Sequence, residues 1–345
     1  MTQPPSGPET EARARGAVLN MVSGFMYTQA IRSAVDLGIA DLVAGGPKPV
    51  NDLAAATKAH EPSLARLLRA LAAFGVLTEE EPGRFGPTPR SDLLRRDHPR
   101  SLRPAALYFG KPWIQDPWRD LTYAVQTGRS AFEHVHGADY WQYLADHQDE
   151  AAVFNELLAL LRPQRHAAVV EAYEFADMRT LVDIGGGYGQ LLVAVLKAHP
   201  EMRGVLFDLP SVVTGARATL EEGGVAGRCE VVGGDMFAAV PAGGDAYVLS
   251  NVIHDWGDEA SAAILASCHR AMNGRGILLL VEQLAVPGQM QPSVAAADLH
   301  MLTMFTEARQ RSEPEFQALL QRTAFRLMRI IPTKSDASIV EATPL

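Results

Sequence analysis

The chain has 345 residues, of which 47% are hydrophobic and 21% charged, a composition typical of a globular protein with one large domain or two. Its formal net charge of −9 argues against a general affinity for nucleic acid or anionic membranes, and no apolar run is long enough to span a membrane. Residues 1–15 lack the apolar core of a signal peptide, and Cys229 and Cys268 form no metal-ligand pair, so we expect a protein of the reducing cytoplasm.

The amino-terminal part is predicted to be helical after a short tail. Residues 1–12 have the polar, proline-containing composition of a disordered tail, and residues 17–40 show helical patterning. A short helix is expected over residues 51–57. A second is expected from Glu61 to Gly75, because leucines recur there at helical spacing. Two short strands, residues 76–79 and 84–88, flank a turn. Helix, turn, helix and two-strand wing is the winged-helix plan.

A winged helix allows two interpretations, DNA binding or packing. A helix that reads DNA should present basic and polar side chains to phosphates and base edges. This one offers Arg66 and Arg69 among alanines and leucines. The sequence therefore favours a packing module, although the mildly basic segment does not exclude DNA.

Alternating strands and helices from residue 180 onward predict an α/β domain with a doubly wound, mostly parallel sheet. Residues 101–178 are helical in pattern and rich in aromatic side chains; most of these are expected in the core and a few in a flat apolar pocket. We therefore expect a helical, winged-helix-like domain over residues 1–100, a linker and pocket segment over 101–178, and a catalytic domain over 179–345.

The segment LVDIGGGYG, residues 181–189, carries the most specific signal. An apolar strand ends there in a glycine loop, a helix follows over residues 190–197, and a second strand, 204–207, ends at Asp208. Open α/β sheets bind ligands at the carboxyl ends of such strands. The alternative is a glycine loop that merely turns the chain.

The glycine spacing discriminates between ligands. The dinucleotide fingerprint needs glycines at the first, third and sixth positions, and neither register fits. Asp183 is followed instead by Gly185, Gly187 and Gly189, which lets the main chain approach an adenosine and its amino-acid tail. Asp208 suits two ribose hydroxyls, because a carboxylate accepts two hydrogen bonds side by side. This pattern resembles the S-adenosylmethionine (SAM) site of class I methyltransferases.

Two further strands complete the predicted site. After strand 229–232, Asp235 can accept from the adenine amine and Met236 can pack on its ring, unless Asp235 only caps a turn. After strand 246–249 comes His254, at the sheet end that faces the cofactor. Glu282 ends the next strand, 276–281, and could reach the imidazole. A histidine oriented by a carboxylate is the arrangement of a general base.

These motifs together resemble the small-molecule O-methyltransferases of the caffeate, hydroxyindole and bacterial aromatic-polyketide type. The matching segments are LVDIGGGYG, FDLP (207–210), GGDMF (233–237), DAYVLSNVIHDW (245–256), VEQL (281–284) and RQRSEPEF (309–316). The resemblance implies a homodimer in which the amino-terminal winged-helix segment is a dimer element and binds no nucleic acid. It implies no membrane partner and no metal.

The resemblance also assigns residues. It implies that His254 is the base and that Glu282 steadies it. Gln310 stands where the family usually has a second glutamate, with Glu307 nearby, and Ser250 stands where a lysine is frequent. The implied SAM contacts are Asp183, Gly185, Gly187, Asp208, Leu209, Gly234, Asp235, Met236, Phe237, Ser250, Asn251 and Trp256. The implied substrate pocket includes Phe154, Leu158, Met301 and Phe305.

The sequence thus predicts transfer of a methyl group from SAM to a hydroxyl of an aromatic small molecule, in bacterial secondary metabolism. Relatives of this fold have also diverged to hydroxylation or decarboxylation, and methylation of nitrogen or carbon would use the same cofactor site. A SAM-sensing regulator that uses the winged helix is the alternative from another class. The sequence does not name the acceptor.

Overall fold

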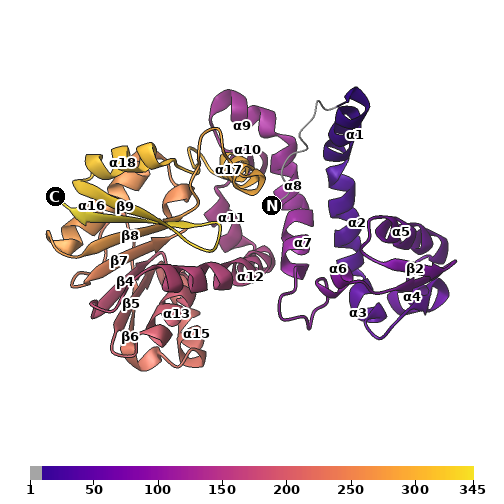
Figure 1. Cartoon of the computed structure of the whole chain (residues 1–345), viewed down its shortest axis with the longest axis horizontal. Helices are drawn as coiled ribbons and strands as arrows, with labels where there is room; N and C mark the ends of the chain where they lie inside the picture. Colours follow the sequence, from indigo (N-terminus) through magenta and orange to yellow (C-terminus); the bar gives the residue numbers. More distant parts are fainter. Residues whose placement is uncertain (1–9) are drawn as a thin grey trace. The chain divides into compact units, whose positions relative to one another are not determined.

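The computed structural model describes residues 10–345, which form two compact units (Figure 1). The first unit contains the chain up to Gln115 together with Asp149–Leu160. The second contains Asp116–Gln148 and Leu161–Leu345. The predicted tail, residues 1–12, lies outside the described residues except for its end, where the first helix begins at Glu11.

The first unit is mainly helical and carries one small antiparallel sheet. Strand β3 (Arg84–Gly86) lies between β1 (Lys48–Pro49) and β2 (Thr78–Glu81). The two predicted wing strands are confirmed as β2 and β3, whereas β1 is too short to show an alternating pattern. The helices are α1 (Glu11–Val22), α2 (Gly24–Asp36), α3 (Ile39–Val43), α4 (Val50–Thr57), α5 (Glu61–Ala73), α6 (Pro89–Asp92) and α7 (Arg103–Gly110).

Helix α5 illustrates why this unit folds as predicted. Pro62 lies in its first turn, where a missing N–H costs nothing. Leu64, Leu68 and Leu71 share one buried face and join the apolar cluster of the unit. Two further helices, α8 (Pro112–Arg119) and α12 (Gln148–Ala172), have residues in both units.

The second unit is built on a seven-stranded sheet in the order β6-β5-β4-β7-β8-β10-β9. The five strands β6, β5, β4, β7 and β8 pair in parallel with their neighbours in this order. Strand β10 is antiparallel to both of its neighbours, β8 and β9. This is the class I methyltransferase arrangement that the sequence predicts. The strands are β4 (Thr180–Ile184), β5 (Arg203–Asp208), β6 (Cys229–Gly233), β7 (Ala246–Ser250), β8 (Ile277–Glu282), β9 (Phe325–Pro332) and β10 (Ser338–Pro344).

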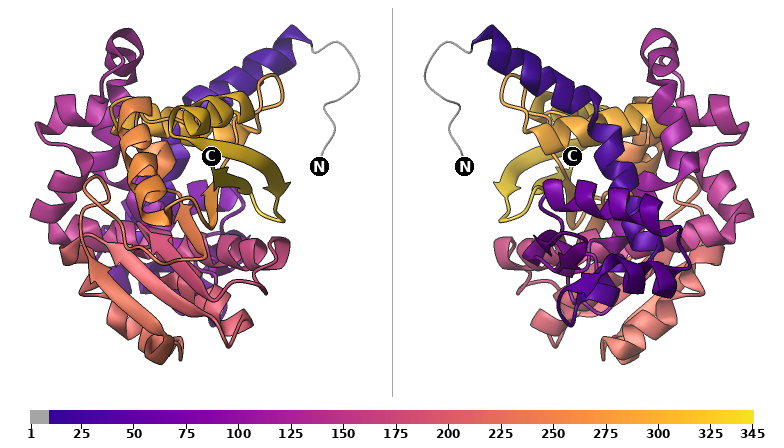
Figure 2. Two further views of the ribbon diagram at one scale, coloured as in Figure 1. Left: turned by 90° about the vertical axis from the view of Figure 1, so that its left-hand side faces the viewer. Right: turned by 90° about the vertical axis from the view of Figure 1, so that its right-hand side faces the viewer.

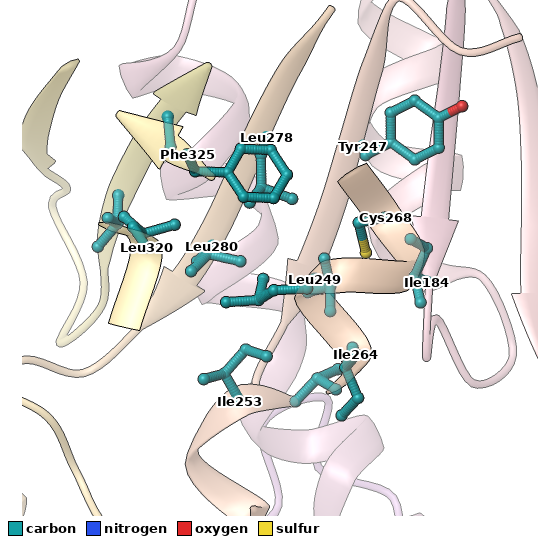
Figure 3. Close-up of a cluster of buried hydrophobic side chains, with 14 of the residues drawn as sticks. Ile184, Tyr247, Leu249, Ile253, Ile264, Cys268, Leu278, Leu280, Leu320 and Phe325 are labelled. Atoms are coloured by element: carbon teal, nitrogen blue, oxygen red, sulfur yellow. The ribbon is translucent and has the colours of Figure 1, made fainter. Parts of the chain in front are cut away.

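Helices cover both faces of this sheet and create two apolar cores. One core joins the sheet to α16 (Asp258–Met272) and α18 (Glu313–Arg322), and Ile264, Leu320 and Phe325 lie in it (Figure 3). The other joins the sheet to α13 (Gln190–Ala198), α15 (Ala216–Glu222) and the end of α12. Strand residues alternate between the cores: Tyr247 and Leu249 belong to the first, Ala246 and Val248 to the second. Burial on both faces explains the continuous apolar runs of these strands.

The remaining elements of the second unit lie around this framework. The hairpin β9–β10, yellow in Figure 2, forms one edge of the sheet. No helix in residues 10–345 is long and apolar enough to cross a membrane. The other helices are α9 (Leu121–Thr127), α10 (Ala131–His136), α11 (Tyr140–Asp146), α14 (Pro210–Val213), α17 (Pro292–Met304) and the short 3-10 turns η1 (Ala226–Arg228) and η2 (Ile253–Asp255).

The strand order indicates where an open sheet of this kind would bind a ligand. Strand β4 lies between β5 and β7, and the chain crosses from one half of the sheet to the other at this point. Loops at the carboxyl ends of the two neighbouring strands therefore diverge and leave room for a ligand. The loops after β4, β5, β6 and β7 and the end of β8 carry the polar residues described next.

Candidate active site

The loop after β4 is shaped by its glycines. Gly185, Gly187 and Gly189 all adopt left-handed backbone conformations, with φ of +67°, +61° and +80°. Side chains are strained in this conformation, and a Cβ at Gly185 would lie 2.8 Å from Val252 Cγ2. The loop therefore exposes main chain rather than side chains, as the sequence predicts for a loop that contacts a ligand directly.

Asp208, at the end of β5, is fixed by this loop. Its Oδ2 accepts a hydrogen bond of 2.8 Å from the N–H of Gly187, and its Oδ1 accepts one of 2.7 Å from the N–H of Leu209. Burial raises the pKa of Asp208, and these two hydrogen bonds and the charge of Arg162 oppose the shift. Each oxygen keeps a further lone pair for a ligand hydroxyl.

Asp183, the last polar residue within β4, lies beneath the loop. It is 1% exposed, and neither carboxylate oxygen has a hydrogen-bond partner among the described residues. Burial raises its pKa to about 7, although the nearby Arg162 lowers it. A buried carboxylate without partners is costly, and a cation bound nearby would reduce that cost.

Arg162 supplies a positive charge to the same region. It comes from α12, and its Nη1 lies 3.3 Å from the position that a Cβ of Gly187 would take. Burial lowers the pKa of Arg162, while the carboxylates of Asp183, Asp255 and Asp208 raise it. Arg162 thus lies next to the loop and interacts with three carboxylates.

The loop after β6 is tied to the same edge of the sheet. The N–H of Gly234 donates to the carbonyl oxygen of Asp208 at 3.0 Å. Asp235 accepts from the N–H of Phe237 at 2.9 Å, so it does cap a turn, the alternative noted from the sequence. The Phe237 ring packs edge-on against Trp256, with centroids 4.9 Å apart. Met236 is partly buried against the same core.

The central pair of the site is His254 and Glu282. His254 lies in η2 after β7, and its Nδ1 is 2.5 Å from Glu282 Oε2 at the end of β8. Glu282 is 0% exposed, and its Oε1 accepts from the N–H groups of Val252 and Ile253 at 3.2 and 2.9 Å. The carboxylate thus faces three donors, which fixes Nδ1 of the imidazole as protonated and leaves Nε2 for another partner.

Asp255 is a second acidic neighbour of the imidazole. Its Oδ1 lies 3.3 Å from His254 Nε2, and both side chains are 15% exposed. Burial lowers the pKa of His254, but the carboxylates of Glu282 and Asp255 outweigh it and raise that pKa to about 9. Burial also raises the pKa of Asp255 to about 6, against the opposing charge of His254.

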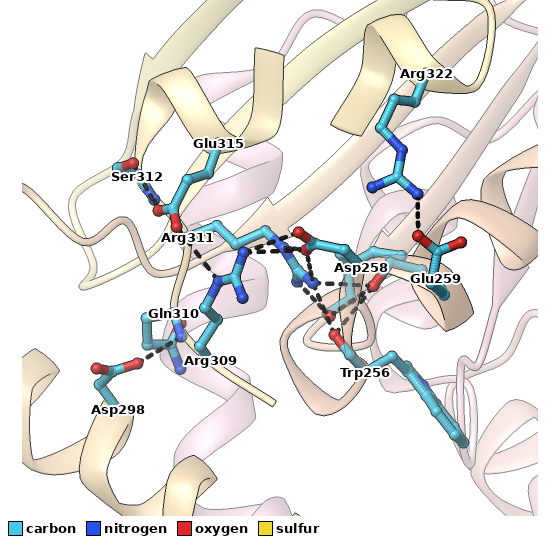
Figure 4. A network of polar contacts seen from close by, with 12 residues as sticks. Trp256, Asp258, Glu259, Asp298, Arg309, Gln310, Arg311, Ser312, Glu315 and Arg322 are labelled. Carbon is cyan, nitrogen blue, oxygen red and sulfur yellow. Dashed lines mark hydrogen bonds and ion pairs between the residues drawn. The ribbon is translucent and has the colours of Figure 1, made fainter. Parts of the chain in front are cut away.

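A buried arginine holds the main chain around His254 (Figure 4). The side chain of Arg311 is 0% exposed and donates to the carbonyl oxygens of Ile253 and Trp256, both at 2.8 Å. Its charge is balanced by Asp258, at the start of α16, 2.9 Å away. Because Glu282 binds the N–H groups of this turn and Arg311 its carbonyls, the position of the imidazole is fixed from both sides.

Among the side-chain contacts of the described residues, neither Gln310 nor Glu307 is bound to the imidazole of His254, unlike Glu282 and Asp255. The N–H of Gln310 donates to Asp298 Oδ1 at 2.7 Å, and its buried Oε1 has no hydrogen-bond partner among the described residues. Glu307 is exposed and contacts Gly257. The N–H of Arg309 donates to the carbonyl oxygen of His254 at 3.0 Å, so this segment runs beside the imidazole.

The other predicted residues are distributed over both units. Phe154 and Leu158 belong to the first unit, where the ring centroids of Phe154 and Tyr108 are 6.0 Å apart. Met301 and Phe305 belong to the second unit, where the ring centroids of Phe305 and Tyr140 are 5.0 Å apart. The buried Ser250 Oγ has no hydrogen-bond partner in the part of the chain that is described.

Asn251 and three charged residues complete the polar environment, and the charged residues are not predicted from the sequence. Asn251 accepts from Arg165 Nη1 at 2.7 Å. Arg162 and Arg165 are three residues apart on α12, but this spacing is too common to indicate a site. Asp255 directly follows the predicted base, and that position is the signal that could have identified it. Within residues 10–345, no cluster of three or more His, Cys, Asp or Glu side chains is arranged to hold a metal ion.

Two family descriptions match this chain. The O-methyltransferase domain matches residues 118–326, and the O-methyltransferase dimerisation domain matches residues 19–97. The winged-helix segment thus belongs to a dimerisation domain, in agreement with the packing interpretation.

Individual relatives extend over nearly the whole chain. Phenazine O-methyltransferase PhzM of Lysobacter antibioticus is 47% identical over 97% of this chain and 100% of its own length. Phenazine-1-carboxylate N-methyltransferase of Pseudomonas aeruginosa is 32% identical over 94% of this chain and 96% of its own length. The O-methyltransferase NcsB1 from neocarzinostatin biosynthesis was solved with SAM and 2-hydroxy-5-methyl naphthoic acid. It is 32% identical to this chain, with a TM-score of 0.82 over 92% of this chain and 96% of NcsB1. The chain therefore belongs to the SAM-dependent O-methyltransferase family of bacterial secondary metabolism.

Proposed function

We propose that this enzyme transfers a methyl group from SAM to a hydroxyl of a flat aromatic small molecule, with His254 as the general base. The observation that carries the proposal is the His254–Glu282 pair, 2.5 Å apart. Val252, two residues before His254, lies against Gly185 of the glycine loop. Fixing Nδ1 as a donor leaves Nε2 as the atom that can accept a proton from an acceptor hydroxyl.

The residues around the glycine loop fit SAM. Asp208 keeps lone pairs for the ribose hydroxyls, Asp235 and Met236 suit the adenine, and Arg162 suits the methionine carboxylate. The buried, unpartnered carboxylate of Asp183 supports the proposal because SAM carries an ammonium and a sulfonium. When bound, SAM supplies an electrophilic methyl group. Further contacts are proposed for Leu209, Gly234, Phe237, Ser250, Asn251 and Trp256.

The raised pKa of His254 has a consequence for the proton transfer. A phenol has a pKa of about 10, so an ordinary histidine at about 6.5 would face an uphill transfer of roughly 5 kcal/mol. At a pKa of about 9 the gap falls to about one unit, or roughly 1.4 kcal/mol. With this pKa, His254 is a stronger base, but before it can accept a proton its Nε2 must lose its own proton and its contact with Asp255 Oδ1.

The acceptor is proposed to be flat and mostly apolar. Met301 and Phe305 lie on or next to α17, and a methionine adapts its shape to different ring systems. Phe154 and Leu158, which belong to the first unit, are proposed as substrate contacts on the family resemblance. NcsB1 was solved in complex with a naphthoic acid, a flat fused-ring molecule, and this supports a flat aromatic acceptor for the present enzyme.

We infer that the enzyme works as a homodimer. Helices α1 and α2 expose apolar side chains that a monomer would leave in water: Met21 and Val22 are 78% and 71% exposed, and Phe25 and Met26 are 58% and 57% exposed. A patch of this kind marks an association surface, and it overlaps the dimerisation-domain match over residues 19–97.

The proposal is tested by incubating the protein with methyl-labelled SAM and a panel of phenols, naphthols, phenazinols, anthraquinones and indoles. We expect a product that gains one methyl group on oxygen, as determined by mass spectrometry and NMR. The variant H254A should lose most of this turnover and still bind S-adenosylhomocysteine (SAH).

Methylation of a ring nitrogen instead of a hydroxyl would overturn the O-methyl assignment, and the N-methyltransferase relative makes aromatic nitrogen the natural competitor. Turnover of H254A near the wild-type rate would remove His254 from its role.

A further inference from the structure

Arg165 joins α12 to two loops at the carboxyl edge of the sheet. Its Nη1 donates to Asn251 Oδ1 at 2.7 Å, and its Nε and Nη2 form a forked pair with Asp336 at 2.8 to 3.0 Å. The Arg165 side chain is only 16% exposed, whereas that of Asp336 is 45% exposed. A guanidinium can hold two partners in fixed directions because its donors lie in one plane.

Asn251 is the residue at which the chain leaves the sheet toward His254. Its N–H makes a hydrogen bond of 3.0 Å to the carbonyl of Val281, and its φ is +55°. This left-handed backbone turns the chain directly into the segment that carries the base three residues later. Asparagine is one of the few residues besides glycine that adopt this conformation readily, and Arg165 holds the asparagine side chain in one direction.

Asp336 connects the same arginine to the partner of the base. It lies in the turn between β9 and β10 and also accepts a hydrogen bond from Gln283 Nε2. Gln283 directly follows Glu282. The network Asn251–Arg165–Asp336–Gln283 therefore ends three residues before His254 on one side and next to Glu282 on the other.

We propose that Arg165 is a positioning residue for methyl transfer, which sets the separation of His254 and Glu282 by holding both flanking residues in one charged network. This inference rests on the proposed role of His254 as the base. Arg165 acts through Asn251 and Asp336.

The charges around the imidazole support this role. Glu282 from β8 and Asp255 from η2 raise the pKa of His254, and Arg165 from α12 lowers it. Arg162, from the same helix, faces Asp255. Removing the charge of Arg165 should raise the pKa of the base, whereas keeping the charge and losing the forked geometry should leave that pKa in place.

Three variants separate these effects. Arg165→Gln removes both charge and fork, Arg165→Lys keeps the charge, and Asp336→Asn leaves the arginine but weakens its anchor. Arg217→Gln is the matched control, because Arg217 forms an exposed ion pair with Glu221 within α15. We would measure kcat, both KM values, the pH profile of kcat, SAH affinity by calorimetry, and Tm.

For Arg165→Gln we expect kcat to fall by about tenfold at saturating SAM. SAM KM and SAH affinity should change by less than about threefold, because Arg165 reaches the cofactor site only through Asn251. The acidic limb of its pH profile should move upward by about half a unit. Arg165→Lys and Asp336→Asn should lower kcat by about threefold without moving the limb. The control should match wild type.

A second measurement does not depend on turnover. In protein labelled with ¹³C-histidine, the His254 ring signal, assigned with H254N, should titrate at higher pH in Arg165→Gln than in wild type. An unchanged kcat together with an unchanged titration midpoint would overturn the proposal. So would weaker SAH binding at an unchanged kcat, since Arg165 would then be a cofactor ligand.

Failure of the proposed function gives a different result. If wild type methylates none of the acceptors, the methyltransfer assignment fails, while the ring titration still tests whether Arg165 acts on His254. If Arg165→Gln does not fold, the proposal is tested with Asp336→Asn and Arg165→Lys. A lower kcat in these two variants, with SAH affinity unchanged, would support the positioning role. A wild-type kcat in both would refute it.

Discussion

Glu282 accepts a hydrogen bond of 2.9 Å from the N–H of Ile253, the residue directly before the candidate base. The carbonyl of Ile253 accepts one of 2.8 Å from the buried Arg311. Both ends of this residue are therefore bound by side chains of opposite charge that come from different parts of the chain. The short turn η2 owes its defined position to these contacts.

The first prediction concerns the number of donors that Glu282 accepts. In Glu282→Gln only one oxygen remains, and the amide NH₂ must face either His254 Nδ1 or the two main-chain N–H groups, all of which are donors. We expect kcat to fall by about 10²-fold, Tm to fall, and SAH affinity to stay unchanged. Steady-state kinetics, calorimetry and thermal unfolding measure the three effects.

A matched control for this substitution is Glu259→Gln. Glu259 is 89% exposed and pairs with Arg322, so its loss should change neither kcat nor Tm measurably. Equal losses in both variants would show that the effect is not specific to the buried carboxylate.

The second prediction is an alkaline activity profile. His254 must be deprotonated to accept a proton, and its pKa in the ligand-free chain is about 9. We expect kcat/KM for the acceptor to rise roughly tenfold per pH unit and to level off above that value. A profile that is flat from pH 6 to 9 would contradict the acidic environment described for the imidazole.

The third prediction concerns the buried carboxylate of Asp183. Its pKa is about 7 in the fold against 3.8 as the ordinary value, so ionisation opposes folding. This cost is absent below the ordinary value, grows as the pH rises through the interval between the two, and is complete above about 7. Asp183→Asn should therefore raise Tm at pH 8 and change it little at pH 4.

The same variant should weaken SAM binding, since it removes a negative charge beside the loop. Calorimetric titration with SAM at pH 8 checks this. A variant that is more stable and binds SAM as tightly as wild type would exclude Asp183 from the cofactor site.

The fourth prediction concerns the amide at position 310. The family resemblance puts a carboxylate at this position, and the N–H of the neighbouring Arg309 donates to the carbonyl oxygen of His254 at 3.0 Å. The variant Gln310→Glu tests whether a charge here acts on the imidazole. We expect the new carboxylate to raise the pKa of His254 and to move the acidic limb of the activity profile upward. An unchanged profile would mean that the side chain at 310 does not orient the base. Gln310→Met, which is close in size, controls for packing.

The fifth prediction concerns association. Phe25→Asp or Met21→Asp places a charge in the exposed apolar face of α1 and α2, where both wild-type side chains are more than half exposed. We expect the dimer to dissociate at micromolar concentration, as measured by sedimentation velocity. Val125→Asp is the control, because Val125 is also exposed, at 64%, but lies outside the matched dimerisation domain.

Much of the fold follows from local patterns in the sequence. The five parallel strands of the sheet are predicted within a residue or two, because burial on both faces leaves continuous apolar runs. Helix α13 is predicted as closely, from the apolar spacing after the glycine loop. The pairing of β10 between β8 and β9 is not predictable in this way, since antiparallel pairing at the edge of the sheet depends on contacts distant in sequence.

The residues of the candidate site also fall into a group that the sequence predicts and a group that it does not. Residues at the ends of strands, such as Asp208 and His254, are found from motif and position. Arg162, Arg165 and Arg311 reach the site from helix α12 and from the segment before α18, and their role depends on side-chain direction. No spacing rule gives that direction, so they emerge only from the structure.

Asp208 binds the main chain on both of its oxygens before any nucleoside arrives. Its rotamer is therefore already selected, and the entropy of freezing this side chain is spent in folding the protein and not in capturing the ligand. The ribose that Asp208 is proposed to hold is common to the donor and its demethylated by-product, so we expect this contact to contribute equally to the binding of both and the by-product to compete with the donor.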